Sequence, residues 1–383
     1  MGAAILFKPV AGILYNSLSS SFLIYHLIIF AGCAALLLVP TIFMGATLPV
    51  LSAFYVSRFE RLGSQAGRLY GLNTVGAALG SLVSGFVLIR VLGMNGTLAL
   101  AVGLNAFIGL GAMYLGRSLI AGTDVPAQKA GEESAAASPG DHAPSYPVWL
   151  ALGMFTISGF CGMACQVIWT RLLGLIVGPT TYSFTIVVTS FILGLAIGCF
   201  IFGYLADRVR IPLKLLIYSQ AGAALATVLV SHLLGNSQIF FAKLIARFQD
   251  QFILLATLKI LVLFSFFIIP TILFGAAFPL VLKIITPSLR RVGRTVGIAT
   301  ALNTSGAVVG AFAAGFLLIP LLGKESGIRF IASLQLAAAF ASGVVLFRSR
   351  VSAQGWMPLN TLALAGLASI EPQTATAPEA VAG

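Results

Sequence analysis

The sequence predicts an all-α polytopic membrane protein of about nine transmembrane helices, built from two parallel repeats of which the first is incomplete. Composition, long apolar runs and an internal repeat support this fold class. Of the 383 residues, 59% are hydrophobic and only 8% are charged, whereas a soluble domain carries roughly 25% charged residues. Apolar runs such as residues 20–50, 181–206 and 252–282 exceed the roughly 20 residues that cross a bilayer. They also lack the alternation of barrel strands.

The internal repeat has an offset of 230 residues and relates residues 40–93 to residues 270–323 without a gap, with 21 of 54 positions identical. Many of the matched residues are Gly, Pro or Asn, which shared hydrophobicity alone would not align. Met1 corresponds to Ser231 on this offset, so the first repeat is expected to match only the last three helices of a six-helix unit. Because six is even, both copies share one orientation, as in the two halves of major facilitator (MFS) carriers.

The apolar segments and the polar segments between them divide the chain into four parts. Residues 1–116 form the incomplete first repeat, with expected spans near 20–50, 68–92 and 97–116. Residues 117–147 are rich in Ala, Pro, Ser and Gly and predict a flexible cytoplasmic linker. Residues 348–383 predict a mostly disordered tail. Residues 148–347 form the complete second repeat, with expected spans near 148–176, 181–206, 212–234, 252–282, 296–322 and 327–347.

Loop charges predict the orientation of the chain. Basic residues gather in the segments 52–68, 205–215 and 282–295 and after the last helix, and nine spans place all of them on one side. The positive-inside rule assigns that side to the cytoplasm. We therefore expect a multi-pass protein of the cell inner (plasma) membrane with a cytoplasmic C-terminus. The same pattern explains the net charge of +12, because the basic residues flank spans of the lipid bilayer. The expected partner is therefore the bilayer, and no nucleic acid is expected.

Pairs of glycines four residues apart lie on single faces of three expected helices. Without side chains, two helix backbones can approach closely. We interpret these positions as helix packing surfaces, and surfaces that rock during alternating access would use the same residues. The three pairs are Gly76 and Gly80, Gly194 and Gly198, and Gly306 and Gly310.

A short motif ends one helix of the second repeat and opens a basic loop. It consists of Gly203, Asp207, Arg208 and Arg210 and resembles the loop motif that joins helices two and three of MFS carriers. The resemblance implies a conformational latch, in which the Asp accepts hydrogen bonds from a helix N-terminus and the Arg pairs with a carboxylate. The alternative is an ordinary cytoplasmic helix end with positive-inside charges.

Polar residues inside apolar segments are candidates for a solute path. Lys259 lies about eight residues inside such a segment, roughly 12 Å deep at 1.5 Å per residue, although a lysine can also snorkel to the interface. The matched Asn-Thr pairs in the two repeats have interhelical hydrogen bonding as their alternative role. The complete candidate path is Asn73, Thr74, Gln166, Arg171, Lys259, Asn303 and Thr304.

Signatures of soluble enzymes are missing from the sequence, which has no Gly-rich phosphate loop, no catalytic triad and no metal-ligand cluster. We therefore expect no catalytic residue, no metal and no cofactor. Cys161 and Cys165 share a helix face, but no His or carboxylate is near them in sequence, so they are interpreted as small buried thiols.

Two segments, FMGATLP at residues 43–49 and GRLYGLNTVGA at residues 67–77, resemble the membrane part of fused MFS/spermidine synthase-like proteins. Residues 166–173 and 275–279 fit the same family. In that family two six-helix halves precede a cytoplasmic aminopropyltransferase-like domain with a Rossmann-type sheet, so the resemblance implies a link to polyamines. The chain departs from it by lacking the first three helices and the synthase-like domain. Gln166 also replaces a usual Glu, which weakens cation binding there.

The preferred functional hypothesis is transport of a small polar or cationic solute by an MFS-like protein that is truncated or split, and the resemblance implies a polyamine-related solute. One alternative is a membrane scaffold for a separately encoded aminopropyltransferase-like protein, and another is an inactive gene fragment. Nine helices alone leave a two-half cavity incomplete, and a second copy of the chain is one way to fill the gap.

Overall fold

The computed structural model describes residues 22–121, 148–177, 180–248 and 250–355, and every regular element in these ranges is helical. Residues 122–147 of the expected linker and 356–383 of the expected tail lie outside the described residues. Residues 117–121 of the expected linker form the end of α4, and residues 348–355 of the expected tail form the end of α13. The elements are α2 (Phe22–Tyr55), α3 (Leu62–Val83), η1 (Ser84–Leu88), α4 (Ile89–Ala121), α6 (Val148–Val177), α7 (Thr181–Ala206), α8 (Pro212–Gly235), α9 (Gln238–Phe248), α10 (Phe252–Gly275), α11 (Ala277–Ile285), η2 (Leu289–Arg291), α12 (Val292–Ala313), η3 (Ala314–Leu322) and α13 (Gly323–Gly355).

Seven helical stretches within the described residues are long and apolar enough to cross a membrane. Two of them, Leu62–Arg117 and Leu289–Arg348, contain 56 and 60 residues, which at 1.5 Å per residue is more than twice the roughly 30 Å of a hydrocarbon core. Each therefore has room for two spans. The described chain has the architecture of a polytopic helical membrane protein, and the count of nine spans stays a prediction.

A glycine with positive φ interrupts each of the two longest stretches. Gly93 has φ 68° and ψ 179°, and Gly323 has φ 76° and ψ 177°. This backbone region is essentially restricted to glycine, so the helix direction changes at both residues. The two glycines are 230 positions apart, and α12 begins and ends 230 residues after α3. The helix bounds thus follow the same offset as the sequence repeat.

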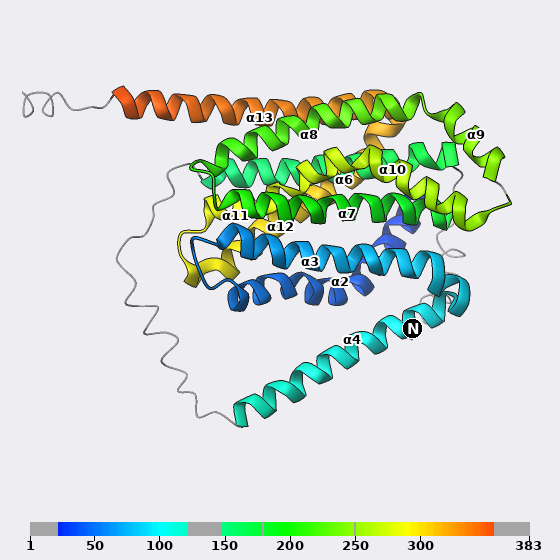
Figure 1. The fold of residues 1–383 in the computed structure, drawn as a ribbon, viewed down its shortest axis with the longest axis horizontal. Coiled ribbons are helices and arrows are strands. Elements are labelled where there is room, and N and C mark those ends of the chain that lie inside the picture. The colour runs from blue at the N-terminus through cyan, green and yellow to red at the C-terminus, as the bar shows by residue number, and fades with distance from the viewer. Residues whose placement is uncertain (1–21, 122–147, 178–179, 249, 356–383) are drawn as a thin grey trace, which may run out of the picture.

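The helices of residues 148–355 form the main bundle, and α3 packs along α7 at its side (Figure 1). Helix α2 lies against α12, whereas α4 departs from the bundle after η1 and runs away from it (Figure 1). Most described side chains of α2 and α4 are exposed, as expected for helices that face lipid. The buried core therefore belongs mainly to the second repeat.

Two clusters of buried apolar side chains fill the bundle, one at each end. One is centred on α11, where Leu280 and Val281 are fully buried. The other surrounds Trp169 of α6 and Phe267 of α10, whose ring centroids are 4.8 Å apart. The loops 56–61, 207–211 and 286–291 lie together at one end of the bundle (Figure 1). We call this the basic end, because it carries Arg58, Arg61, Arg208, Arg290 and Arg291.

Candidate functional site

The N-terminus of α3 is capped by a residue from the end of α7. The side chain of Arg61, at the N-cap position of α3, makes no capping hydrogen bond. Instead, the N–H of Gly63 donates to Asp207 Oδ1 at 2.9 Å, and the N–H of Ser64 donates to Asp207 Oδ2 at 2.7 Å. The Ser64 hydroxyl donates to the same Oδ2 atom. Asp207 therefore satisfies amides that a helix start leaves without partners and places a negative charge at the positive end of the helix dipole.

Lys283 of α11 supplies the positive charge at this carboxylate. Its Nζ lies 3.0 Å from Asp207 Oδ1 and also donates to the carbonyl oxygens of Phe59 at 2.8 Å and Glu60 at 3.0 Å. The two charged side chains are only 15% and 10% exposed. Because each ion has several hydrogen-bond partners, the cost of removing it from water is largely offset.

Glycines allow the carboxylate to reach the helix start. A Cβ atom on Gly67 would lie 2.6 Å from the carbonyl oxygen of Cys199, and one on Gly203 would lie 2.8 Å from that of Gly63. The backbones of α3 and α7 therefore touch directly, which holds Asp207 at hydrogen-bonding distance from Gly63. Of the four motif residues named from the sequence, Gly203 and Asp207 act at this contact.

The two arginines of the motif are placed differently from the expectation. The guanidinium of Arg208 stacks over the ring of Tyr204, 3.7 Å from its centroid, and within the described ranges no carboxylate pairs with Arg208 or Arg210. Lys283 takes the cationic role instead. Sequence reasoning counted Lys283 only among the positive-inside charges of residues 282–295, and no short motif singled it out as the partner of Asp207.

A small central cavity of about 130 Å³ lies between α3, α6, α7, α10, α11 and α12. Five of its lining side chains are aromatic, and the ring of Tyr70 stacks on that of Phe278 with centroids 4.2 Å apart. Its polar side chains include Tyr70, Ser158 and Asn303, and none of its lining residues is charged. The lining residues are Tyr70, Phe155, Ser158, Gly159, Gly162, Met163, Phe191, Leu195, Cys199, Phe274, Gly275, Phe278, Asn303 and Ala307.

Asn303 is the candidate path residue that lines this cavity. Its amide nitrogen donates to the carbonyl oxygen of Phe155 at 2.8 Å, so it joins α12 to α6 as well as presenting a polar group. Thr74 is buried, but its hydroxyl donates to the carbonyl oxygen of Tyr70 in its own helix at 2.6 Å. Thr74 therefore has a local structural role.

The other candidate path residues lie away from the central cavity. Asn73, Arg171 and Thr304 are exposed, and Gln166 and Lys259 are half-buried on α6 and α10. None of these five is among the residues that line the cavity. The structure thus brings one of the seven to the central cavity, and it does not join them into a single path.

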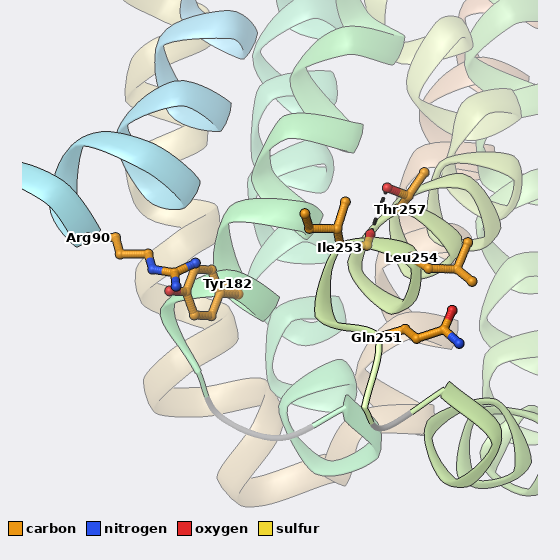
Figure 2. Close-up of a pocket in the computed structure, with 6 residues that line it drawn as sticks. All are labelled: Arg90, Tyr182, Gln251, Ile253, Leu254 and Thr257. Atoms are coloured by element: carbon orange, nitrogen blue, oxygen red, sulfur yellow. Dashed lines mark hydrogen bonds between the residues drawn. The ribbon is translucent and has the colours of Figure 1, made fainter.

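A wider hollow of about 900 Å³ is formed by residues of helix ends, and in Figure 1 the starts of α7 and α10 lie at the end of the bundle opposite to the basic end. The hollow is lined by the starts of α4, α7 and α10, and Figure 2 shows Arg90 extended toward the ring of Tyr182. The Thr257 hydroxyl donates to the carbonyl oxygen of Ile253 in its own helix at 2.9 Å. Because three separate helix starts form this hollow, its width depends on how those starts are spaced.

In the described part of the chain, no group of three or more His, Cys, Asp or Glu side chains is arranged to hold a metal ion. Cys161, Cys165 and Cys199 are buried free thiols, and Cys33 is an exposed one. Comparison of the chain with protein-family models, with curated proteins and with solved structures gave no match.

Proposed function

We propose that the chain is an MFS-like carrier that moves a small polar or cationic solute through the central cavity. The observation that carries this proposal is the cap of Asp207 on α3. It joins the first repeat to the second at one end of the cavity by hydrogen bonds and an ion pair. Such groups are stable when closed and are readily hydrated when open, as an alternating contact requires.

The size of the central cavity supports a small solute. A cavity of roughly 150 Å³ holds one benzene molecule, so the 130 Å³ found here accommodates about six non-hydrogen atoms. Aromatic faces attract cations, while Ser158 and Asn303 offer hydrogen bonds. A diamine meets both conditions. The uncharged lining favours weak binding, which suits a carrier that must also release its solute.

The experiment is uptake of labelled putrescine, a diamine, by liposomes that contain the purified chain. Gly162 lines the cavity, and a Cβ there would meet Phe274 at an ordinary distance of 3.7 Å. Gly162→Val therefore places two methyl groups in the cavity from a Cβ position that is free of clashes. Gly153→Val is the matched control on the same helix, since no described atom lies within 4 Å of a Cβ at that position.

We expect Gly162→Val to reduce uptake by about tenfold or more through loss of the cavity, and Gly153→Val to retain it. Equal uptake by both variants would show that the solute does not use this cavity. If neither putrescine nor a panel of small polar solutes enters the liposomes, the transport proposal fails.

The scaffold hypothesis has one supporting feature. Helix α13 continues to Gly355 and extends past the other helices at the basic end (Figure 1). We propose as the second candidate function that this extension recruits an aminopropyltransferase-like protein. Co-purification of such an enzyme with the full chain, and its loss when residues 348–355 are replaced by a Gly-Ser segment, tests this candidate.

A further inference from the structure

The two repeats carry the same stripe of small and polar residues on matched helices. Each stripe has the form Asn-x-x-Gly-x-x-x-Gly, and its members lie on one helix face. The α3 stripe is Asn73, Gly76 and Gly80, and the α12 stripe is Asn303, Gly306 and Gly310.

Helix α6 covers the α12 stripe by direct backbone contact. A Cβ on Gly306 would lie 2.2 Å from the carbonyl oxygen of Thr156, and a Cβ on Gly310 would lie 2.2 Å from that of Phe160. Both contacts advance by four residues along each helix, so α6 and α12 run parallel at this crossing. The stripe is thus a packing surface for a parallel helix, and it lets the two helix backbones come closer than larger side chains would permit.

The covering helix must itself meet two requirements. Its residue opposite the Asn must be small, because a Cβ on Gly159 would lie 2.3 Å from the carbonyl oxygen of Asn303. It must also present a carbonyl oxygen to the Asn amide, as Phe155 does at 2.8 Å. The carbonyl oxygen of the buried Phe155 is available to Asn303 although it belongs to a helix, since a carbonyl oxygen has two lone pairs.

The α3 stripe has no such cover among the described residues. No described atom lies within 4 Å of a Cβ on Gly76 or Gly80, and the flanking Leu72 and Leu79 are 69% and 58% exposed. The contact of α3 with α7 uses its other face, through Gly63 and Gly67. The stripe is therefore surplus to the packing of α3 within the described bundle.

We infer that the α3 stripe is the docking site of one further transmembrane helix of the α6 kind. That helix runs parallel to α3, has Gly opposite Asn73, and accepts a hydrogen bond from the Asn73 amide. An amide left without a partner in hydrocarbon is costly, and docking removes that cost. This inference rests on the matched contact of α12 with α6, and it holds whether or not the chain transports a solute.

A second copy of α3 is the less suitable occupant. Self-pairing through Gly76 and Gly80 would place one stripe against another, whereas the α12 stripe meets ordinary α6 carbonyls at Thr156 and Phe160 together with the single Gly159. The observed contact is therefore between two different helices, and a partner helix with a glycine and a free carbonyl oxygen at the positions found in α6 fits the α3 stripe.

The test uses α6 itself as the probe. A synthetic peptide with the sequence of residues 148–177, Cys161 and Cys165 replaced by Ala, carries an acceptor dye at its N-terminus. The full chain carries a donor dye on Cys33, which is exposed while the other three thiols are buried. Energy transfer is measured in liposomes against a peptide of scrambled sequence.

We expect saturable energy transfer that the scrambled peptide does not give. The double variant Gly76→Leu/Gly80→Leu should weaken binding by about tenfold or more, because two leucines prevent close helix approach. The matched control Gly103→Leu/Gly109→Leu adds the same side chains at two positions in α4 that are also open, and it should leave binding unchanged. The peptide variant Gly159→Leu should lose binding as the chain variant does.

Three outcomes would overturn the inference. One is energy transfer no greater than that of the scrambled peptide. The second is binding that survives Gly76→Leu/Gly80→Leu, which would mean that the peptide exchanges with α6 on the α12 stripe. The third is transfer between two labelled full chains that the double variant abolishes while the peptide does not bind, which would make a second copy the occupant. No described atom is near a Cβ at Gly76 or Gly80, so the double variant is expected to fold normally. An unchanged melting temperature of that variant checks this expectation.

Discussion

Lys283 and Asp207 form an ion pair of 3.0 Å that joins α11 to the end of α7 beside the first turn of α3. Three segments far apart in the sequence thus meet at one carboxylate. Asp207 itself ends α7; Lys283 supplies the opposite charge, and the α3 amides of Gly63 and Ser64 supply hydrogen bonds. A substitution in any one of these segments should therefore weaken the contacts of the other two.

Replacing Asp207 by Asn keeps the size of the side chain but removes its charge. We expect the contact between α3 and α7 to weaken by roughly 1.5–3 kcal/mol, the usual range for hydrogen bonds to charged groups. Cys199 reports this change, because its backbone touches Gly67 in the same contact and its thiol is buried. The maleimide labelling rate of Cys199 should rise in Asp207→Asn. The control Glu325→Gln breaks an exposed pair with Arg329 and should leave the rate unchanged, whereas equal rates in all three proteins would refute the latch.

Lys283→Met should destabilise the same contact, since it removes the charge and two hydrogen bonds to the loop before α3. Combined with Asp207→Asn, its effect should be less than additive, with a coupling of about 0.5–3 kcal/mol. A thermal or denaturant unfolding series of the wild type, both single variants and the double variant measures this coupling. Lys243→Met, at an exposed position on α9, is the control, and additive effects of the pair would contradict the described network.

Matched glycines of the two stripes should respond in opposite ways to alanine. Gly306→Ala places a Cβ 2.2 Å from the Thr156 carbonyl oxygen, so α12 must move from α6 and stability should fall by about 1–3 kcal/mol. Gly76→Ala meets no described atom and removes a flexible glycine, so it should be neutral or stabilising by up to about 1 kcal/mol. Melting temperatures in one detergent compare the two variants, and a similar loss for both would contradict the difference in packing.

The glycine at the start of α13 should not tolerate a side chain. Gly323 has φ 76° and ψ 177°, and a non-glycine residue in this region costs roughly 1–3 kcal/mol. Gly323→Ala should therefore lower the melting temperature, as should Gly93→Ala at the matched break. Gly343→Ala lies in the same helix as Gly323 with open space around it, and it should raise or keep the melting temperature. If Gly323→Ala behaves like Gly343→Ala, the break does not require glycine.

The apolar runs predicted most helices, but several bounds depend on contacts that a sequence does not show. A span was expected from residue 68, whereas α3 begins at Leu62, because Asp207 of another helix caps its first turn. The expected span 252–282 is divided at Gly275, where a Cβ would lie 2.3 Å from the carbonyl oxygen of Leu195. The short helix α9 was not expected, since 11 residues do not cross a membrane.

The candidate site was predictable only in part for a related reason. Asp207 and Asn303 stand out because polar residues are rare in this chain. Tyr70, Phe274 and Phe278 do not, although they line the central cavity. Membrane helices are apolar on all sides, so the periodic pattern that marks the buried face of a soluble helix is weak. Which rings face the cavity is decided by helix packing alone.

Two π-helical segments, η1 and η3, follow α3 and α12 and begin at Ser84 and Ala314, 230 residues apart. A π turn accommodates about one more residue than an α turn, which corresponds to a rotation of roughly 100° about the helix axis. The side chains beyond each π segment therefore point in a different direction around the helix axis from the one that an uninterrupted α-helix would give them. Deleting one residue from Ser84–Leu88 would turn the remainder of the span, together with Gly93, toward another neighbour, while the α3 stripe kept its direction. Each π segment therefore lets the residues before it and the residues after it point in independently set directions. The α3 stripe and the break at Gly93 can then contact different neighbouring helices.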